Sequence, residues 1–327
     1  MEKSVLYTPV LFLVFNRPEK TQRVFDIIKR VKPQKLYVAA DAPREGNQSD
    51  TIGCEEVRKI VKQVDWECET HYLFHEKNLG CTLAGKTAWD WFFSQEDRMI
   101  FIEDDGFASD SFFFYCQELL EKYKDNDKIA YIGGVNYMAY SGNASYFFSR
   151  YCPPTYGMAT WKRVYDLYDY DMKSYETIRN SYDFVHGFWW KFERDLFRTK
   201  YDRYVNSVKE GKRENTYDVQ MSYLCWRFHK YNIHPNANLV ANIGFDYDGS
   251  NTIVDPNSSI AQFFSRPNED IKELVHPSTI MVSKEDERNF FIKKVLLGKN
   301  YYFSALKFYF NRELYKVKSI IKRCIGR

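Results

Sequence analysis

The first 135 residues alternate short apolar runs with segments of helical hydrophobic spacing. Five runs rich in β-branched and aromatic residues are typical of strands, at 10–15, 35–41, 71–74, 99–102 and 129–135. Helical spacing lies between them, as in 18–31 and 111–123. Strands that alternate with helices of about 10 to 15 residues favour a parallel, doubly wound sheet. We therefore predict an α/β fold for this half of the chain.

The alternation of strand-like and helical patterns ends at about residue 150. Three segments with helical spacing are joined by polar loops without regular strands between them, at 156–168, 188–197 and 216–231. From residue 292 to the end there are ten lysines and arginines but one acid, Glu313. We therefore expect three parts: an α/β half over 1–150, a mostly helical half over 151–265, and a basic helical tail over 266–327.

Composition excludes several classes of protein. The 327 residues are 44% hydrophobic and 18% aromatic, which indicates a packed core rather than a disordered chain. No apolar run approaches the roughly 20 residues of a membrane span, and the N-terminus lacks the pattern of a signal peptide. The seven cysteines include no C-x-x-C pair, which favours reduced thiols over disulfides or a zinc site. We expect a cytoplasmic protein.

Three acidic residues, Glu103, Asp104 and Asp105, directly follow the fourth predicted strand. Like charges this close raise one another's pKa unless water screens them or a cation lies among them. If the chain stays extended, Glu103 and Asp105 share one side and Asp104 faces the other. Ligands of parallel sheets bind beyond the carboxyl ends of strands, and Mg²⁺ or Mn²⁺ prefers oxygen ligands. The alternatives are a solvated acidic turn and a metal site, and we favour the metal site.

Three further side chains near element ends have both a functional and a structural interpretation. Asp41 could accept the imide N–H of a uracil or cap the turn that begins at Pro43. Arg17 could bind a phosphate with two hydrogen bonds or lie on the surface. Lys86 could reach a diphosphate or point to solvent. The sequence holds neither G-x-G-x-x-G after the first strand nor a P-loop motif, which disfavours both of those phosphate-binding modes.

Aromatic residues of the second half also have two possible roles. Tyr156, Trp161, Trp189 and Trp190 could stack on a sugar ring or fill the core, as most aromatic side chains do. The six histidines show no metal-binding spacing, so we assign none of them to a metal.

Seven segments, in this order, resemble the GT-A fold glycosyltransferases. They are FNRPEKT, DAPR, NLGC, EDDGFASDSFFFY, YGMATWKRVY, NTYDVQMSY and HPNANLVANIGFDYDGSNT. The likeness covers residues 8–253 and is closest to the N-acetylglucosaminyltransferase that starts complex N-glycan branching and to its bacterial relatives. It implies a Rossmann-like, mostly parallel sheet flanked by helices. It also implies transfer of a sugar from a nucleotide diphosphate sugar, expected to be UDP-linked, to a hydroxyl of a glycan or glycolipid.

The resemblance implies roles for the donor half at 1–150. Asp105 would bind Mn²⁺ or Mg²⁺ directly, and Glu103 would contribute to the metal site. Glu103 and Asp104 would hold metal-bound water and the donor ribose. Asp41 would read the nucleobase and Arg17 would bind the nucleotide portion, with Lys86 as a further donor contact.

The half at 151–265 would bind the acceptor, with Tyr156 and Trp161 in the acceptor segment. The resemblance implies that Asp218 is the general base that deprotonates the acceptor hydroxyl, and that the anomeric configuration inverts. The animal relative has two adjacent acids here, whereas this chain has one. A shifted alignment would give the role to Glu214 or Glu210.

The basic tail has apolar residues at spacings of three and four. They are Phe303, Leu306, Phe310, Leu314, Val317, Ile321 and Cys324. This stripe could pack on the protein or on a second subunit, or residues 300–327 could lie on an anionic membrane. A lipid-linked glycan acceptor at the inner membrane face would suit the second alternative. The tail holds no nucleic-acid-binding motif, and we expect no nucleic acid partner.

Two other functions compete with glycosyl transfer. A sugar nucleotidyltransferase shares the architecture of the first half, but it would have a glycine-rich basic loop after the first strand, and FNRPEK holds no glycine. A non-catalytic sugar- or nucleotide-binding module, held at the membrane by its tail, would not depend on Asp218.

Overall fold

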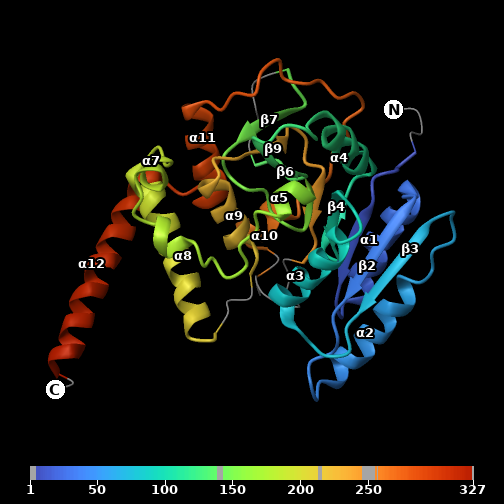
Figure 1. Ribbon diagram of the computed structural model, residues 1–327, viewed down its shortest axis with the longest axis horizontal. Helices are drawn as coiled ribbons and strands as arrows, with labels where there is room; N and C mark the ends of the chain where they lie inside the picture. Colours follow the sequence, from blue (N-terminus) through green and yellow to red (C-terminus); the bar gives the residue numbers. More distant parts are fainter. Residues whose placement is uncertain (1–4, 138–142, 213–215, 245–254, 256, 326–327) are drawn as a thin grey trace.

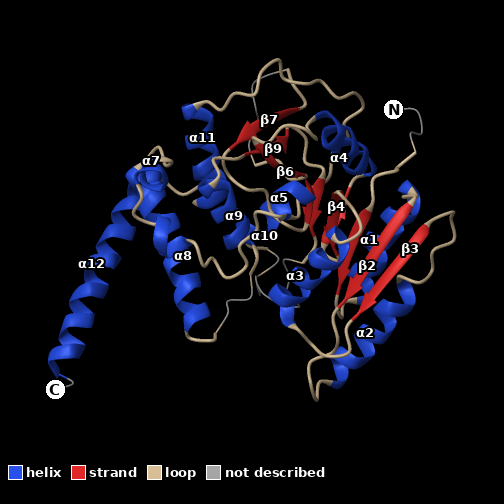
Figure 2. Ribbon diagram, in the orientation of Figure 1, coloured by secondary structure: helices blue, strands red, loops and turns tan. Residues whose placement is uncertain are grey.

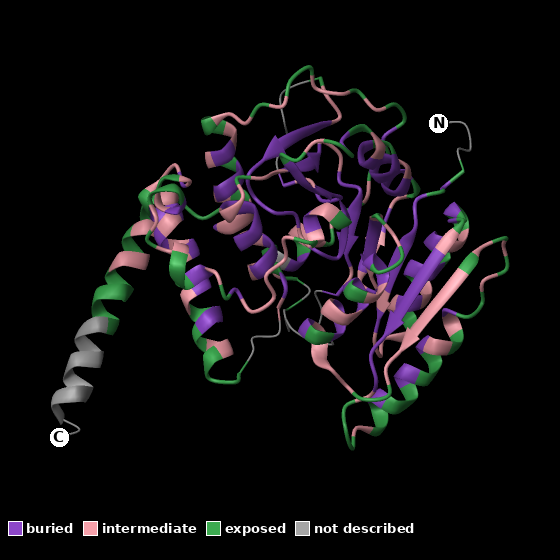
Figure 3. Cartoon of the chain, in the orientation of Figure 1, coloured by how far each residue is buried: buried purple, intermediate pink, exposed green. Residues whose placement is uncertain are grey.

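A computed structural model describes residues 5–137, 143–212, 216–244, 255 and 257–325 (Figure 1). Its centre is an eight-stranded sheet in the order β3-β2-β1-β4-β8-β6-β9-β7, with helices packed around it (Figure 2). The predicted α/β fold with a mostly parallel central sheet is confirmed. Burial is deepest along this sheet, and exposed residues gather on the outer helices (Figure 3).

The first half follows the predicted alternation closely. Its parallel strands are β1 (Val10–Val14), β2 (Lys35–Ala40), β3 (Glu69–Phe74) and β4 (Arg98–Glu103). The helices between and after them are α1 (Pro18–Val31), α2 (Gln48–Ile60), α3 (Gly80–Phe93) and α4 (Asp110–Lys122). Helix α1 begins with Pro18, whose fixed φ suits a first helical turn. At the start of helix α2 the Asn47 side chain accepts a hydrogen bond from the Asp50 N–H and caps the helix.

The remaining strands belong to the same sheet. The first half adds β6 (Ile129–Gly133), at the fifth predicted run, and β7 (Tyr146–Ser149). The second half adds β8 (Gly157–Trp161) and β9 (Tyr231–Pro235). Strand β8 lies between β4 and β6 and runs antiparallel to both. The prediction that this half lacks regular strands is wrong, because β8 is buried on both faces and shows no polar alternation. The sheet is therefore continuous across the boundary expected at residue 150.

Short elements complete the second half. A two-stranded sheet pairs β5 (Gly106–Ala108) with β10 (Val240–Asn242). The remaining helices are α5 (Lys162–Tyr165), α6 (Tyr175–Ile178), α7 (Tyr182–His186), α8 (Lys191–Lys209), α9 (Asp218–Arg227), α10 (Ser259–Phe264) and α11 (Lys284–Phe290). A π-helical turn, η1 (Phe291–Val295), and the long α12 (Tyr301–Ile325) follow.

A buried arginine joins α8 and α11 to the sheet. Arg150 pairs with Glu193 of α8 at 3.1 Å and with Glu287 of α11 at 2.9 Å. Its guanidinium also lies over the ring of Trp189, with 3.9 Å between the guanidinium carbon and the ring centroid. This contact favours the structural interpretation of Trp189. The two ion pairs of Arg150 hold α8 and α11 in place beside the sheet.

Helix α12 projects from the body of the protein (Figure 1). Tyr301 and Phe308 pack against Phe192 of α8. The predicted stripe lies elsewhere: Phe303 and Phe310, for example, are 66% and 67% exposed. The alternative in which this stripe packs on the body is therefore wrong for its described part. Within the described residues, no helix is long and apolar enough to cross a membrane.

Candidate active site

An acidic turn lies at the carboxyl edge of the sheet, where β1 and β4 end side by side. The parallel register pairs Leu13 of β1 with Glu103, the last residue of β4. Arg17 follows β1 closely and precedes α1. Because this connection is short, the Arg17 side chain contacts Asp104 and Asp105, the two residues that follow β4.

The Arg17 guanidinium is the cation that lies between these carboxylates. Its Nε donates to Asp104 Oδ2 at 3.4 Å, and Nη1 donates to Asp105 Oδ2 at 3.3 Å. A further pair joins Arg17 Nη2 to Asp104 Oδ1. Burial would lower the pKa of Arg17, but the charges of Asp104 and Asp105 outweigh it and raise that pKa. Arg17 therefore stays charged and offsets the repulsion between its two partners.

The three acidic residues do not alternate as an extended strand would place them. Strand β4 ends at Glu103, and the chain turns at Asp104 and Asp105. Both aspartates consequently meet Arg17, whereas Glu103 accepts a hydrogen bond from the Tyr217 hydroxyl. The extended chain on which the predicted alternation depended is therefore absent, although the charge of Asp105 still acts on Glu103 more strongly than that of Asp104. Burial and the nearby Asp105 charge raise the pKa of Glu103 to about 8, although the Tyr217 hydrogen bond opposes this.

One oxygen of the acidic turn fits a divalent cation. Asp105 Oδ1 is buried and has no hydrogen-bond partner among the described residues. No three histidine, cysteine or acidic side chains of the described residues are arranged as a complete metal site. Mg²⁺ and related ions are commonly held by one or two carboxylates together with water and phosphate oxygens. Asp105 is suited to be such a ligand, and the metal itself stays a prediction.

Asp41 lies at the end of β2 and is buried. Its carboxylate accepts hydrogen bonds from the backbone N–H groups of Leu79 and Gly80, each at 3.0 Å. The Asn78 amide donates at 3.1 Å and the Ala42 N–H at 2.9 Å. A carboxylate has about four acceptor positions, and these donors fill them. The contacts favour the capping interpretation, at the start of α3 rather than at Pro43, over the nucleobase role.

Lys86 and Trp161 also take structural positions. Lys86 pairs with Asp90 one turn further along α3, and no described contact brings it to the acidic turn. Trp161 ends β8, is 4% exposed, and donates its indole N–H to the Leu120 carbonyl at 3.1 Å. Because Trp161 belongs to the core, we do not retain its predicted stacking on an acceptor sugar.

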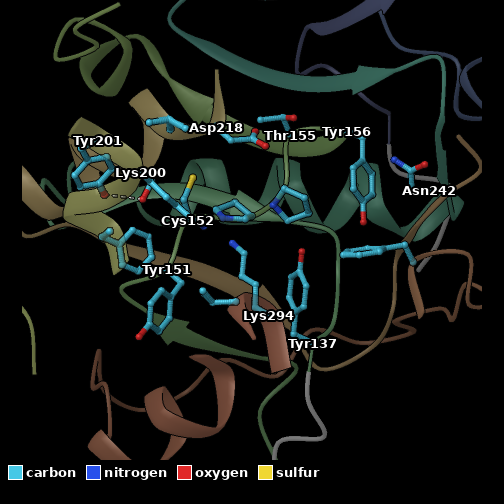
Figure 4. A pocket seen from close by; sticks show the side chains of 17 residues that line it. Tyr137, Tyr151, Cys152, Thr155, Tyr156, Lys200, Tyr201, Asp218, Asn242 and Lys294 are labelled. Carbon is cyan, nitrogen blue, oxygen red and sulfur yellow. Dashed lines mark hydrogen bonds between the residues drawn. The ribbon is translucent and has the colours of Figure 1, made fainter. Parts of the chain in front are cut away.

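A cavity of about 360 Å³ lies among α8, α9, η1 and the segment 151–156 that precedes β8 (Figure 4). Polar residues of its lining come from segments far apart in the sequence, among them Tyr137, Thr155, Tyr156, Lys200, Asp218 and Lys294. The buried Tyr156 hydroxyl has no hydrogen-bond partner among the described residues. A buried donor without a partner raises the free energy of the ligand-free protein. Tyr156 is thus suited to contact a ligand, and its contact with an acceptor stays a prediction.

Asp218 is the first residue of α9 and lines this cavity. Its side chain is open to solvent within the cavity, yet the walls around it restrict hydration. This enclosure raises the pKa of Asp218, while the charges of Lys294 and Lys200 and the adjacent Thr155 hydroxyl oppose the rise. Asp218 can accept a proton from a bound hydroxyl. Of the alternatives for this role, Glu210 is exposed at the end of α8, and Glu214 lies outside the described residues.

Close backbone contacts connect the acidic turn to the cavity. A Cβ atom at Gly106 would collide with the Tyr156 carbonyl oxygen, and one at Gly244 would collide with the Asp105 carboxylate. The Glu103 N–H donates to the same Tyr156 carbonyl at 3.3 Å. Only glycine permits these approaches, and the one at Gly106 holds the acidic turn against Tyr156 of the cavity lining.

Three residues of the site were not predicted from the sequence. Tyr217 joins Glu103 to the start of α9. In the sequence, only its position next to Asp218 could have identified it as a site residue. Lys200 and Lys294 line the cavity but belong to segments that carry no motif.

No protein-family model matches the sequence, and no curated protein does. Among solved structures, HddC from Yersinia pseudotuberculosis is 13% identical over 48% of this chain and 78% of that chain, with a TM-score of 0.30. A UDP-glucose pyrophosphorylase complexed with UDP-glucose is 10% identical over 49% and 78%, with a TM-score of 0.31. S. aureus TarS 1-349 is 10% identical over 49% and 48%, with a TM-score of 0.32. Likeness at this level does not define an activity, so the function rests on the geometry of the site.

Proposed function

We propose that the protein is a nucleotide-sugar-dependent glycosyltransferase. It would move a sugar from a nucleotide diphosphate, expected to be UDP, to a hydroxyl group of a glycan or glycolipid. One observation carries the proposal: the hydrogen bond from Tyr217 to Glu103 joins the acidic turn at the sheet edge to the segment that begins with Asp218. The acidic turn that would bind the cation and the carboxylate that would serve as the base therefore belong to directly linked segments.

At the donor end, Arg17 and Asp105 are the groups that would meet the diphosphate. A guanidinium can bind phosphate oxygens with two hydrogen bonds, so Arg17 would exchange part of its contact with Asp104 and Asp105 for the donor. Asp105 would hold Mn²⁺ or Mg²⁺, with Glu103 contributing through water. A bound divalent ion would stabilise the negative charge of the leaving diphosphate.

At the acceptor end, Asp218 would take the proton of the attacking hydroxyl. A positioned base of this kind contributes about 10²- to 10⁴-fold to a rate. Tyr156 would donate a hydrogen bond to the acceptor through its otherwise unpartnered hydroxyl. If the hydroxyl attacks from the face opposite the diphosphate, the configuration of the transferred sugar inverts.

The first test is a panel of UDP-, GDP- and CMP-sugars in thermal unfolding, with and without Mn²⁺. A ligand at 100 times its dissociation constant stabilises the folded state by about 2.7 kcal/mol. We expect metal-dependent stabilisation by one nucleotide class and release of the nucleoside diphosphate when an acceptor is present. Release of pyrophosphate from a nucleoside triphosphate and a sugar phosphate would instead identify a nucleotidyltransferase. Ligand binding without turnover by any acceptor would favour the binding module.

We also propose that α12 holds the enzyme on an anionic membrane, where a lipid-linked acceptor would be available. Phe303, Leu306 and Phe310 are each at least 66% exposed on this helix. The seven basic residues from 300 to 327 complement anionic lipid headgroups, at about 1 kcal/mol for each Lys or Arg near the surface. An apolar stripe on a basic helix is typical of interfacial helices.

Co-sedimentation with phosphatidylglycerol-containing vesicles tests this attachment. Replacing the three stripe residues by serine should abolish binding while α12 keeps its packing through Tyr301 and Phe308. Ile52→Ser, at an exposed apolar residue of α2, is the control and should bind as the wild type does. The proposal would be contradicted if the stripe variant bound the vesicles as well as the wild type does. It would also be contradicted if the wild type formed a stable dimer in solution and the stripe variant were a monomer.

A further inference from the structure

Two lysines line the cavity beside Asp218 without a carboxylate partner. Lys200 comes from α8 and Lys294 from η1 (Figure 4). Within the described residues, neither amino group forms an ion pair, and Asp218 is the one acidic side chain in the lining. The Lys294 amino group lies 5.4 Å from the centroid of the Tyr137 ring. The lining therefore holds two cationic groups against one anionic group.

Enclosed ammonium groups without counter-charge are costly, and proteins normally pair them. Burial lowers the pKa of Lys294 to about 8, with Cys152 and Asp218 opposing the decrease. Burial also lowers the pKa of Lys200, which Asp218 again opposes. An amino group with a pKa near 8 is mostly protonated at neutral pH. The ligand-free cavity thus keeps an excess of positive charge that a bound anion would neutralise.

The neutral polar groups of the cavity favour the same kind of ligand. Tyr156 is 7% exposed, and its buried hydroxyl has no partner among the described residues. A hydroxyl can donate to an oxyanion, as can the two ammonium groups. Charge-assisted hydrogen bonds of this kind are roughly twice as strong as neutral ones. Lys200, Lys294 and Tyr156 can therefore donate to an oxyanion in the cavity. Asp218, the one carboxylate of the lining, can then accept the proton of the acceptor hydroxyl.

We propose that this cavity binds an oxyanion of the acceptor, a phosphate or a carboxylate, through Lys200 and Lys294. The acceptor is then an anionic glycan or glycolipid, and its charged group positions a neighbouring hydroxyl at Asp218. This inference rests on the proposed function and specifies its substrate class. If the lysines served instead only to keep Asp218 ionised, the cavity would not distinguish an anionic from a neutral compound.

Binding of small probes tests the inference without turnover. Glycerol 3-phosphate and glucuronate are the anionic probes, glycerol and glucose are the neutral ones, and sodium chloride keeps the ionic strength constant. We expect saturable calorimetric binding of at least one anionic probe and none of the neutral ones. The anionic probe that binds more tightly shows whether the cavity prefers a phosphate or a carboxylate. Lys200→Gln and Lys294→Gln should each weaken this binding at least tenfold, whereas Lys293→Gln, at the exposed neighbouring residue, should not.

Equal responses to charged and neutral probes would overturn the inference, as would unchanged binding in both cavity variants. If a variant does not fold, crystals of the wild-type protein soaked in the anionic probe give a second readout. Density between Lys200 and Lys294 would support the site, and density at Arg17 alone would contradict it. Because no donor is present, a failure here is separate from a failure of glycosyl transfer, which the nucleotide-sugar panel measures.

Discussion

The Tyr217 hydroxyl donates a hydrogen bond to the carboxylate of Glu103, which ties the start of α9 to the end of β4. Asp218 follows Tyr217 directly, so the position of the proposed base depends on this bond. The Tyr217 ring also packs against α3, where a Cβ at Gly85 would lie 3.1 Å from it. One tyrosine thus connects the sheet edge, α3 and the cavity.

Tyr217→Phe should lower the free energy of unfolding by about 1–3 kcal/mol, because it leaves a buried carboxyl group without its donor. It should also lower turnover, since Asp218 loses its support. The control is Tyr165→Phe, which removes a hydroxyl that donates to the exposed Asp90 at 2.6 Å and should cost less. Denaturant unfolding measures both variants, and equal losses would argue against a special role for the Tyr217 bond.

Asp218→Asn should reduce turnover by about 10²- to 10⁴-fold, because an amide cannot accept the acceptor proton. The affinity for the nucleotide sugar should stay near the wild-type value, since Asp218 lies in the cavity rather than at the acidic turn. Glu210→Gln is the matched control and should retain activity. The assignment of the base fails if Glu210→Gln is the inactive variant of the two.

Arg17→Met should destabilise the protein by about 3–5 kcal/mol, the usual cost of removing one partner from a buried ion pair. Asp104 and Asp105 would then repel each other without compensation, so Mn²⁺ should raise the unfolding temperature more in this variant than in the wild type. Arg30→Met removes an exposed pair with Asp110 at 2.7 Å and should cost about 0–1 kcal/mol. An identical response of wild type and Arg17→Met to Mn²⁺ would contradict metal binding at this turn.

Activity should fall on acidification at a pH above the usual aspartate pKa of about 3.9. Enclosure raises the pKa of Asp218, and the protonated acid cannot serve as a base. The charges of Lys294 and Lys200 oppose this shift. Lys294→Met should therefore move the acidic limb of the pH–rate profile to higher pH, and Lys293→Met should leave it in place. If the acidic limb does not move in Lys294→Met, Lys294 does not influence the pKa of the base.

The first half of the chain was predicted well, because neighbouring residues in the sequence determine its strands and helices. Apolar runs of β-branched residues define β1 to β4, and parallel strands bring Arg17 and the acidic turn to one edge. The turn at Asp104 was left as one of two alternatives, since three consecutive acidic residues do not reveal where a strand ends. Asp41 was ambiguous for a related reason: its donors, at residues 78–80, meet it only after the chain has folded.

The acceptor half was harder to predict because tertiary packing defines it. Strand β8 is short and wholly buried, so its residues carry no alternation that separates strand from helix. Lys294 lies in η1, directly after α11, which Arg150 joins to the body through Glu287. The face on which α12 packs is likewise decided by Phe192, which lies far away in the sequence.

Crystals grown with Mn²⁺ and UDP test the central claim most directly through the anomalous signal of manganese. The account predicts a manganese peak bonded to the Asp105 carboxylate and to diphosphate oxygens, with Arg17 turned toward the nucleotide. Nucleotide bound at another place, with Arg17 still paired to Asp104 and Asp105 and no metal beside them, would contradict it.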